Sequence, residues 1–128
     1  APTAGGPGGA DAARSLGSEA PGTARSTPCP LTITAAQVYQ WADATGDRSP
    51  IHLRAGAARR AGLDAGATDV VVHGLFLGAL SLALVPAAGC VDLRFPAPAV
   101  LPEAGAVALN VGADGGLSTG VHAVLVRR

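Results

Sequence analysis

The sequence predicts an α+β domain, because two different periodicities of apolar residues divide the chain. Apolar residues recur at helical spacing between residues 35 and 45, whereas they alternate with polar residues from 91 to 95. Helical segments therefore come first and antiparallel strands last, an order that is typical of the α+β class. With 128 residues, the chain has room for one such domain with a sizeable core.

The beginning of the chain differs in composition from the remainder. Residues 1–30 consist mainly of Gly, Pro, Ala, Ser and Thr, and Leu16 is their single large aliphatic residue. Such a segment buries too little apolar surface to offset the entropy cost of ordering it. We therefore predict a flexible tail or linker over residues 1–30 and a folded domain over residues 31–128.

Local signals place the elements of this domain. Thr34 and Gln37 form a capping-box pattern ahead of a helix over 35–45, and Gly46 ends that helix. A short helix is predicted at 55–61, and a very apolar, uncharged helix at 74–85 that we expect to be buried on all sides. Strands are expected at 70–72, 91–95, 106–111 and 117–126, with turns at 101–105 and 112–116.

The charge balance excludes two classes of partner. The net charge is zero, charged residues make up 14% and aromatic residues 3%, so we expect neither nucleic acid nor an anionic membrane surface as a partner. The uncharged segment 75–85 spans about 16 Å as a helix, which is too short to cross a bilayer. Cys29 and Cys90 define no disulfide framework and no zinc site, and no signal-peptide pattern is present. These features favour a cytoplasmic location.

The first candidate functional segment is the loop over residues 46–52, with the sequence Gly-Asp-Arg-Ser-Pro-Ile-His. Asp47 and His52 flank a turn that Pro50 stiffens, so both side chains can be directed at one point. An Asp–His pair can hold a water molecule and share the acid and base roles around it. From spacing alone, the alternative remains that Asp47 caps a turn and His52 begins the next helix.

The second candidate is the pair His73 and Gly74, directly before the apolar helix. The first turn of a helix has unpaired N–H groups and a partial positive charge, and Gly74 would let a ligand approach them closely. Such a site suits a thioester carbonyl that becomes enolate-like in the transition state. The alternative is that His73 only begins the helix and that Gly74 only permits close packing.

Together and in this order, these features resemble the MaoC-like (R)-specific enoyl hydratase/dehydratase family, over residues 33–95. The family's loop pattern is G-D-x-N-P-[LIV]-H, and residues 46–52 match every fixed position except the Asn, which is Ser49 here. The other matching segments are Trp41–Gly46, Ala61-Gly62, Val72-His73-Gly74-Leu75, and Asp92–Phe95 followed by Pro96.

The resemblance implies a single hot-dog domain, in which an antiparallel sheet wraps round a buried apolar helix. Family members add water to trans-2-enoyl thioesters, or remove it from (3R)-3-hydroxyacyl thioesters, carried on coenzyme A or an acyl carrier protein. By position, Asp47 and His52 would be the acid/base pair and the Gly74 amide would polarise the thioester carbonyl, with His73 and Ser49 beside the substrate. Neither a cofactor nor a metal is implied. Hot-dog domains of this size usually pair, so we expect a homodimer or a heterodimer with another hot-dog subunit.

Two departures from the family pattern favour a remodelled relative. Ser49 has a shorter reach and fewer donors than the Asn that it replaces. The chain also passes from Val107 to Val126 with one predicted turn, so the C-terminal sheet is shorter than the family's by about one hairpin. Such a sheet would leave edges and part of the helix exposed unless a partner covers them.

Several alternatives therefore stay open. The substrate could be a polyketide-like or other specialised intermediate, and Arg48 and Arg54 could contact a phosphate or the phosphopantetheine arm. A non-catalytic hot-dog subunit that supports a partner or binds an acyl group is the first alternative to an enzyme. A hot-dog thioesterase would share the fold.

Overall fold

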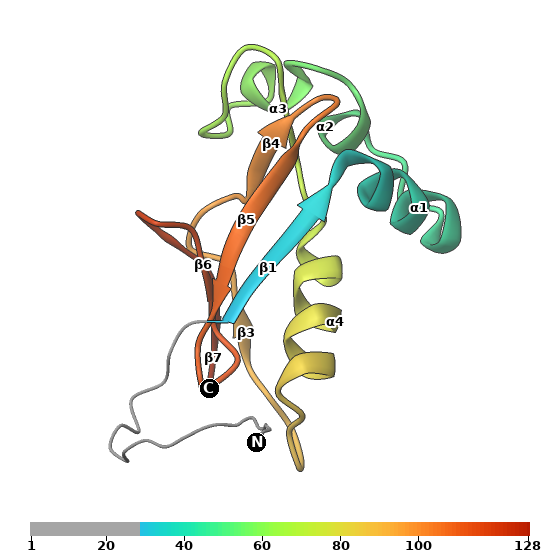
Figure 1. The fold of residues 1–128 in the computed structure, drawn as a ribbon. Helices are drawn as coiled ribbons and strands as arrows, with labels where there is room; N and C mark the ends of the chain where they lie inside the picture. Colours follow the sequence, from blue (N-terminus) through green and yellow to red (C-terminus); the bar gives the residue numbers. More distant parts are fainter. Residues whose placement is uncertain (1–28) are drawn as a thin grey trace, which may run out of the picture.

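A computed structural model describes residues 29–128. The first strand, β1 (Cys29–Thr34), begins within the last residues of the predicted linker. The linker prediction otherwise falls outside the described residues. Figure 1 shows that the helices before residue 61 gather at one end of the molecule, while the helix that begins at Gly74 lies along the sheet.

The strands form an antiparallel five-stranded sheet in the order β1-β5-β6-β7-β3, and β2 and β4 form a separate antiparallel pair. β1 and β5 make the longest pairing, which runs from Cys29 opposite Val111 to Thr34 opposite Ala106. The remaining strands are β2 (Asp69–Val71), β3 (Leu93–Arg94), β4 (Val100–Pro102), β5 (Ala106–Val111), β6 (Leu117–Ser118) and β7 (Ala123–Arg127). This arrangement confirms the predicted α+β class.

The first helix, α1 (Ala35–Thr45), has the predicted bounds and the predicted caps. The Gln37 N–H donates to the Thr34 hydroxyl at 3.2 Å, and the Thr34 N–H donates to the Gln37 side chain at 2.9 Å. At the other end, Gly46 adopts a φ of 79°, a left-handed conformation that glycine adopts without strain. The local capping chemistry thus fixes both ends of α1.

Two further short helices follow the Asp47 loop. α2 (Pro50–Leu53) begins at the proline, which is the residue best suited to a first helical position. α3 (Ala57–Arg60) occupies the middle of the predicted helix over 55–61. α2 has no counterpart among the helices predicted from the sequence. The hydroxyl of Tyr39 in α1 donates to the Leu53 carbonyl at 3.0 Å and so ties α1 to the end of α2.

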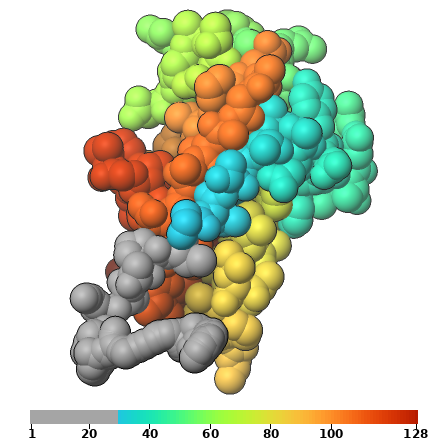
Figure 2. All heavy atoms as spheres, viewed as in Figure 1, coloured from blue at the N-terminus to red at the C-terminus, as the bar shows by residue number. Residues whose placement is uncertain are grey.

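The apolar helix α4 (Gly74–Leu84) was expected to be buried on all sides, and that expectation is wrong for the single chain. Leu77, Gly78 and Ser81 are buried, because the sheet covers one side of the helix. The opposite side is exposed, and the exposed fraction of the Leu75 side chain reaches 74%. In Figure 2, atoms of α4 form part of the molecular surface.

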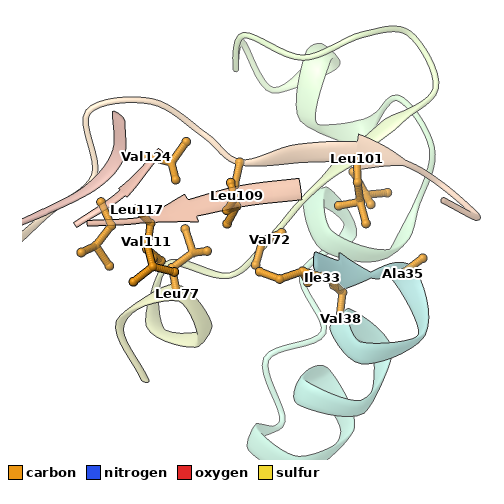
Figure 3. Close-up of a cluster of buried hydrophobic side chains, with 13 residues drawn as sticks. Ile33, Ala35, Val38, Val72, Leu77, Leu101, Leu109, Val111, Leu117 and Val124 are labelled. Atoms are coloured by element: carbon orange, nitrogen blue, oxygen red, sulfur yellow. The ribbon is translucent and has the colours of Figure 1, made fainter. Parts of the chain in front are cut away.

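The hydrophobic core lies between the sheet, α1 and the buried side of α4 (Figure 3). Leu109, Val111 and Leu117 contribute from the sheet, and Val38 and Leu77 from the two helices. Small and branched aliphatic side chains therefore fill the core, as the composition requires. None of the helices in the described residues is both long and apolar enough to cross a membrane.

The C-terminal third differs from the prediction at two points. The predicted strand over 117–126 is interrupted by a second turn, because the Thr119 hydroxyl accepts the N–H groups of Val121 and His122 at 3.1 and 3.0 Å. Strands β6 and β7 therefore form a hairpin of their own, and the chain makes two turns after β5 rather than one. The predicted turn over 101–105 begins only after β4, which ends at Pro102.

The C-terminal end of α4 is held by Arg127 of β7. Its guanidinium donates to the carbonyl of Val85, the residue that ends the helix, at 2.6 Å. It also donates at 3.3 Å to the Ser81 carbonyl, which accepts the Val85 N–H as well. The buried Ser81 hydroxyl donates to the Gly115 carbonyl at 2.6 Å. Gly115 has a φ of 88°, and a Cβ there would overlap Nη1 of Arg127.

We predict that Gly115→Ala lowers the free energy of unfolding by about 1–3 kcal/mol, because alanine at this φ is strained and displaces Arg127. Gly120→Ala is the matched control, since a Cβ at Gly120 meets nothing within 4 Å. Its effect should stay within about 0.5 kcal/mol. Urea unfolding measures both, and equal stability of the two variants would contradict this account of the helix end.

Candidate active site

The loop after α1 presents Asp47 to solvent. Gly46 turns the chain, and the Arg48 N–H donates back to the Gly46 carbonyl at 3.1 Å. The Ser49 N–H lies 3.4 Å from the Asp47 carboxylate, and Pro50 then begins α2. The Asp47 side chain remains 55% exposed. A short turn with glycine at one end and proline at the other therefore holds a solvent-accessible carboxylate.

His52 lies in α2 and is almost fully buried, with 8% of its surface exposed. Its Nδ1 donates to the Val71 carbonyl of β2 at 2.7 Å. Because a carbonyl oxygen only accepts, this bond assigns the proton to Nδ1 and leaves a lone pair on Nε2. Nε2 lies 3.9 Å from the Asp47 carboxylate. The structure thus brings together the two residues that the loop spacing paired.

The separation between Asp47 and His52 is too long for a direct hydrogen bond. In the neutral tautomer both atoms are acceptors, so a group that donates two protons is needed to bridge them. A water molecule with hydrogen bonds of ordinary length spans acceptors about 4 Å apart. The arrangement can therefore hold one water molecule between a carboxylate and an imidazole.

The environment of His52 favours the neutral imidazole. Burial has the largest effect and lowers the pKa of His52, and the neighbouring His73 acts in the same direction. The hydrogen bond to the Val71 carbonyl and the Asp47 carboxylate raise the pKa, but less than the other two effects lower it. His52 is consequently suited to accept a proton at neutral pH.

Gly74 is the first residue of α4, and it shares a cavity of about 430 Å³ with His52. The N–H groups of this first turn have no carbonyl one turn earlier, so they face the approach to the helix with a partial positive charge. Most of the cavity wall is apolar. It includes Ile51, Leu63, Val71, Val72, Leu77, Phe95, Pro96, Ala97, Pro98 and Ala99.

His73 directly precedes α4, and its side chain is only 2% exposed. It does not line the cavity, although the sequence analysis assigned it to the substrate side. Its Nε2 donates to the backbone carbonyl of Asp47 at 2.9 Å. Its ring stacks on that of His52, with ring centroids 3.7 Å apart and planes at 19°. The His73 side chain therefore contacts both the Asp47 backbone and the His52 ring.

The other residues that the sequence suggested lie away from the cavity. Among the described residues the Ser49 side chain forms no hydrogen bond, including none to the helix that it precedes. Arg48 forms an ion pair with Asp43 in α1. Arg48 and Arg54 line a different hollow, together with Tyr39 and Glu103. The structure thus brings the two arginines together, but beside an acidic residue.

One oxygen or nitrogen atom from each of Asp47, His52 and His73 could be considered as a metal ligand, since these atoms lie within 4.8 Å of one another. Carboxylate and imidazole are ordinary zinc ligands. A shared ion requires that both imidazole lone pairs point at one position. The two rings are stacked nearly parallel, so their in-plane lone pairs lie in separate planes that do not converge on one position. The observed arrangement therefore does not form a metal site without rotation of a ring.

The sequence did not predict the apolar wall of the cavity or its closeness to Gly74. The apolar wall includes Phe95 and Pro96, which belong to the matching segments of the sequence but carry no chemical signal of their own. A Cβ at Gly74 would lie 3.4 Å from the Phe95 ring, so the two residues are close neighbours. Only the fold places this part of the chain opposite the beginning of α4.

Comparison with known protein families identifies the family of the chain. The family model described as MaoC like domain matches residues 17–113, which is more than half of the chain. The chain therefore belongs to the MaoC-like domain family, and its hot-dog fold follows. The match includes the Asp47 loop, α4 and β5. No curated protein and no solved structure shows significant similarity to the chain.

We predict that the stability of the protein falls when the pH decreases below about 6.5. Since the pKa of His52 is lowered in the folded state, the unfolded chain binds a proton there first, and acid favours unfolding. Urea unfolding between pH 7 and pH 5 measures this slope.

In His52→Asn the slope should become smaller, whereas the exposed His122→Asn should leave it unchanged. A slope in His52→Asn equal to that of the parent protein would show that burial does not disfavour the charged imidazole.

Proposed function

We propose that this MaoC-like protein hydrates 2-enoyl thioesters or dehydrates (3R)-3-hydroxyacyl thioesters of coenzyme A or an acyl carrier protein. The family in general comprises enoyl-CoA hydratases and dehydratases. The observation that carries the proposal is the position of His52, whose Nε2 faces Asp47 and whose ring lines the apolar cavity that Gly74 shares. His52 therefore connects the proposed acid/base pair to the cavity in which we propose the oxyanion site and the acyl chain.

In the proposed hydration, Asp47 and His52 hold the water molecule between their acceptor atoms. One of them removes a proton as the water oxygen bonds to C3 of the enoyl thioester. The electron pair of the C2–C3 double bond moves toward the thioester, and the proton is then returned to C2. One molecule of water is added in total, and the reverse sequence eliminates it.

The negative charge that develops on the thioester oxygen requires stabilisation. The N–H of Gly74 and the partial positive charge of the first turn of α4 can supply it. Glycine at this position leaves the approach free of a side chain. Gly74 lines the same cavity as His52, as a single substrate would require.

The apolar cavity is the proposed site for the acyl chain. Its wall is formed mainly by aliphatic side chains and prolines, and its volume of about 430 Å³ is in the range of small-molecule sites. A polyketide-like or other specialised intermediate fits the same proposal. In either case the apolar chain would lie beside Leu77 and Phe95, with the thioester toward Gly74.

The exposed side of α4 supports a further part of the proposal, namely that the chain binds a partner subunit. Leu75, Leu82 and Leu84 are exposed large aliphatic residues on this one helix, and apolar surface of this kind is typical of an interface. A second copy, or another hot-dog subunit, would cover it. A cytoplasmic location belongs to the same proposal, because Cys29 and Cys90 define no disulfide framework.

The same exposed helix also favours the second candidate, a non-catalytic subunit that supports a related partner. Under that alternative, Asp47 and His52 would be present without activity. A hot-dog thioesterase would use the same water for attack on the thioester carbonyl and release free thiol.

We expect the protein to consume the absorbance of the enoyl thioester in crotonyl-CoA without release of thiol. Asp47→Asn should lower this rate by about 10²–10⁴-fold, because the carboxylate no longer takes part in proton transfer. Asp92→Asn, a change of the same kind at an exposed aspartate near β3, should leave the rate unchanged.

Thiol release that depends on Asp47 would instead indicate a thioesterase. Absence of any reaction with crotonyl-CoA, longer enoyl-CoAs and acyl-carrier-protein thioesters would favour the non-catalytic subunit.

Gly74→Ala should fold normally but lose activity by about tenfold or more. The added Cβ meets the Phe95 ring at 3.4 Å, an ordinary contact, yet it occupies space at the approach to the first turn of α4. Thermal unfolding and steady-state kinetics separate the two effects. A fully active Gly74→Ala protein would mean that the thioester oxygen binds elsewhere.

A further inference from the structure

The side chain of His73 is a buried polar group that the proposed reaction does not use. Only 2% of its surface is exposed, and its Nδ1 has no hydrogen-bond partner among the described residues. A buried nitrogen without a partner disfavours folding. An apolar ring of similar size would therefore pack here without that penalty, which raises the question of what the imidazole contributes.

The imidazole of His73 contacts the Asp47 loop, His52 and Trp41. Its Nε2–H donates to the Asp47 carbonyl at 2.9 Å, across 26 positions of sequence. Its ring lies against the face of His52 at 3.7 Å. The indole of Trp41 lies on another side, with ring centroids 6.5 Å apart, and itself stacks on Phe76. His73 is thus fixed by α1 and α4 and touches both members of the acid/base pair.

We propose that His73 is a positioning residue, which sets the separation between the Asp47 carboxylate and Nε2 of His52. It does so by anchoring the Asp47 backbone through the hydrogen bond from its Nε2. This inference rests on the proposed function for its consequence, since the separation decides whether one water molecule can be shared. The anchoring itself is a property of the structure and can be tested without substrate.

His73 also influences the proton affinity of His52. Three groups face the His52 ring: the Asp47 carboxylate from the loop, the Val71 carbonyl from β2 and His73 from the beginning of α4. After burial and the Val71 hydrogen bond, His73 is the next influence on the pKa of His52, and it lowers that pKa. Replacement of His73 by Phe or Gln should therefore raise the pKa of His52.

Two substitutions separate the contributions of the hydrogen bond and the ring. His73→Phe keeps an aromatic ring for the stack but removes the donor to Asp47. His73→Gln keeps an amide donor that can reach the Asp47 carbonyl but removes the ring. A positioning role and a merely space-filling role give opposite expectations, because a space-filling role predicts that Phe is tolerated and that Gln is damaging.

We expect kcat of His73→Phe on crotonyl-CoA to fall by about 10²-fold, with little change in KM, since small displacements of catalytic groups have effects of this size. His73→Gln should recover most of the lost kcat. Hydrogen–deuterium exchange over residues 46–52 should become about fivefold faster in His73→Phe, the factor that corresponds to one ordinary hydrogen bond. NMR titration should show a raised pKa of His52 in both variants.

His122→Phe is the matched control, because His122 is exposed and lies outside this site. Parental kcat and exchange in His73→Phe, or a greater loss in His73→Gln than in His73→Phe, would overturn the positioning role. If the parent protein shows no hydratase activity but exchange and titration change as expected, the positioning role stands and the proposed function fails. Urea unfolding of each variant shows whether a loss reflects unfolding instead.

Discussion

The hydrogen bonds from two buried histidines to backbone carbonyl groups hold the candidate site together. His52 binds the Val71 carbonyl of β2, and His73 binds the Asp47 carbonyl of the loop after α1. Each bond joins segments that are far apart in the sequence, and each assigns the proton of its imidazole to one nitrogen. Without the His73 bond, the exposed Asp47 loop would be held by its own short turn and by the Arg48–Asp43 ion pair to α1, and neither contact fixes its distance to His52.

The sequence predicts the parts of the fold that depend on neighbouring residues. The Thr34–Gln37 capping box and Gly46 give α1 its observed bounds, and the strand predicted over 106–111, ahead of the turn at Gly112, has the observed bounds of β5. The turn at Thr119 was missed, because a single hydroxyl that accepts two N–H groups interrupts an otherwise apolar, strand-like run. The exposure of α4 was missed for another reason. Uniform apolarity indicates that a helix is covered, but not whether the same chain covers it.

The sequence likewise predicts part of the candidate site but not all of it. The spacing of Asp47 and His52 around Pro50 predicts that the two side chains converge, and they lie 3.9 Å apart. Their catalytic roles remain predictions. The position of His73 could not be deduced from the sequence. Its hydrogen bond joins the beginning of α4 to the Asp47 loop, and its ring lies near Trp41 of α1. Likewise, the segment from Phe95 to Ala99 lines the cavity only because it connects β3, which pairs with β7, to β4, which pairs with β2.

The position of α4 relates the contacts of His73 and Gly74 to the proposed chemistry. The beginning of α4 carries both His73 and Gly74, so the same segment anchors Asp47 and presents the amide proposed to bind the thioester oxygen. The other end, about 16 Å away, is held by Arg127 and Ser81 against β7 and the Gly115 turn. Because a helix of this length moves largely as a rigid body, the C-terminal contacts also help to fix the position of Gly74. An exposed apolar side is compatible with such a helix, since its ends and one face already determine where it lies, and a partner on the remaining face would restrict it further.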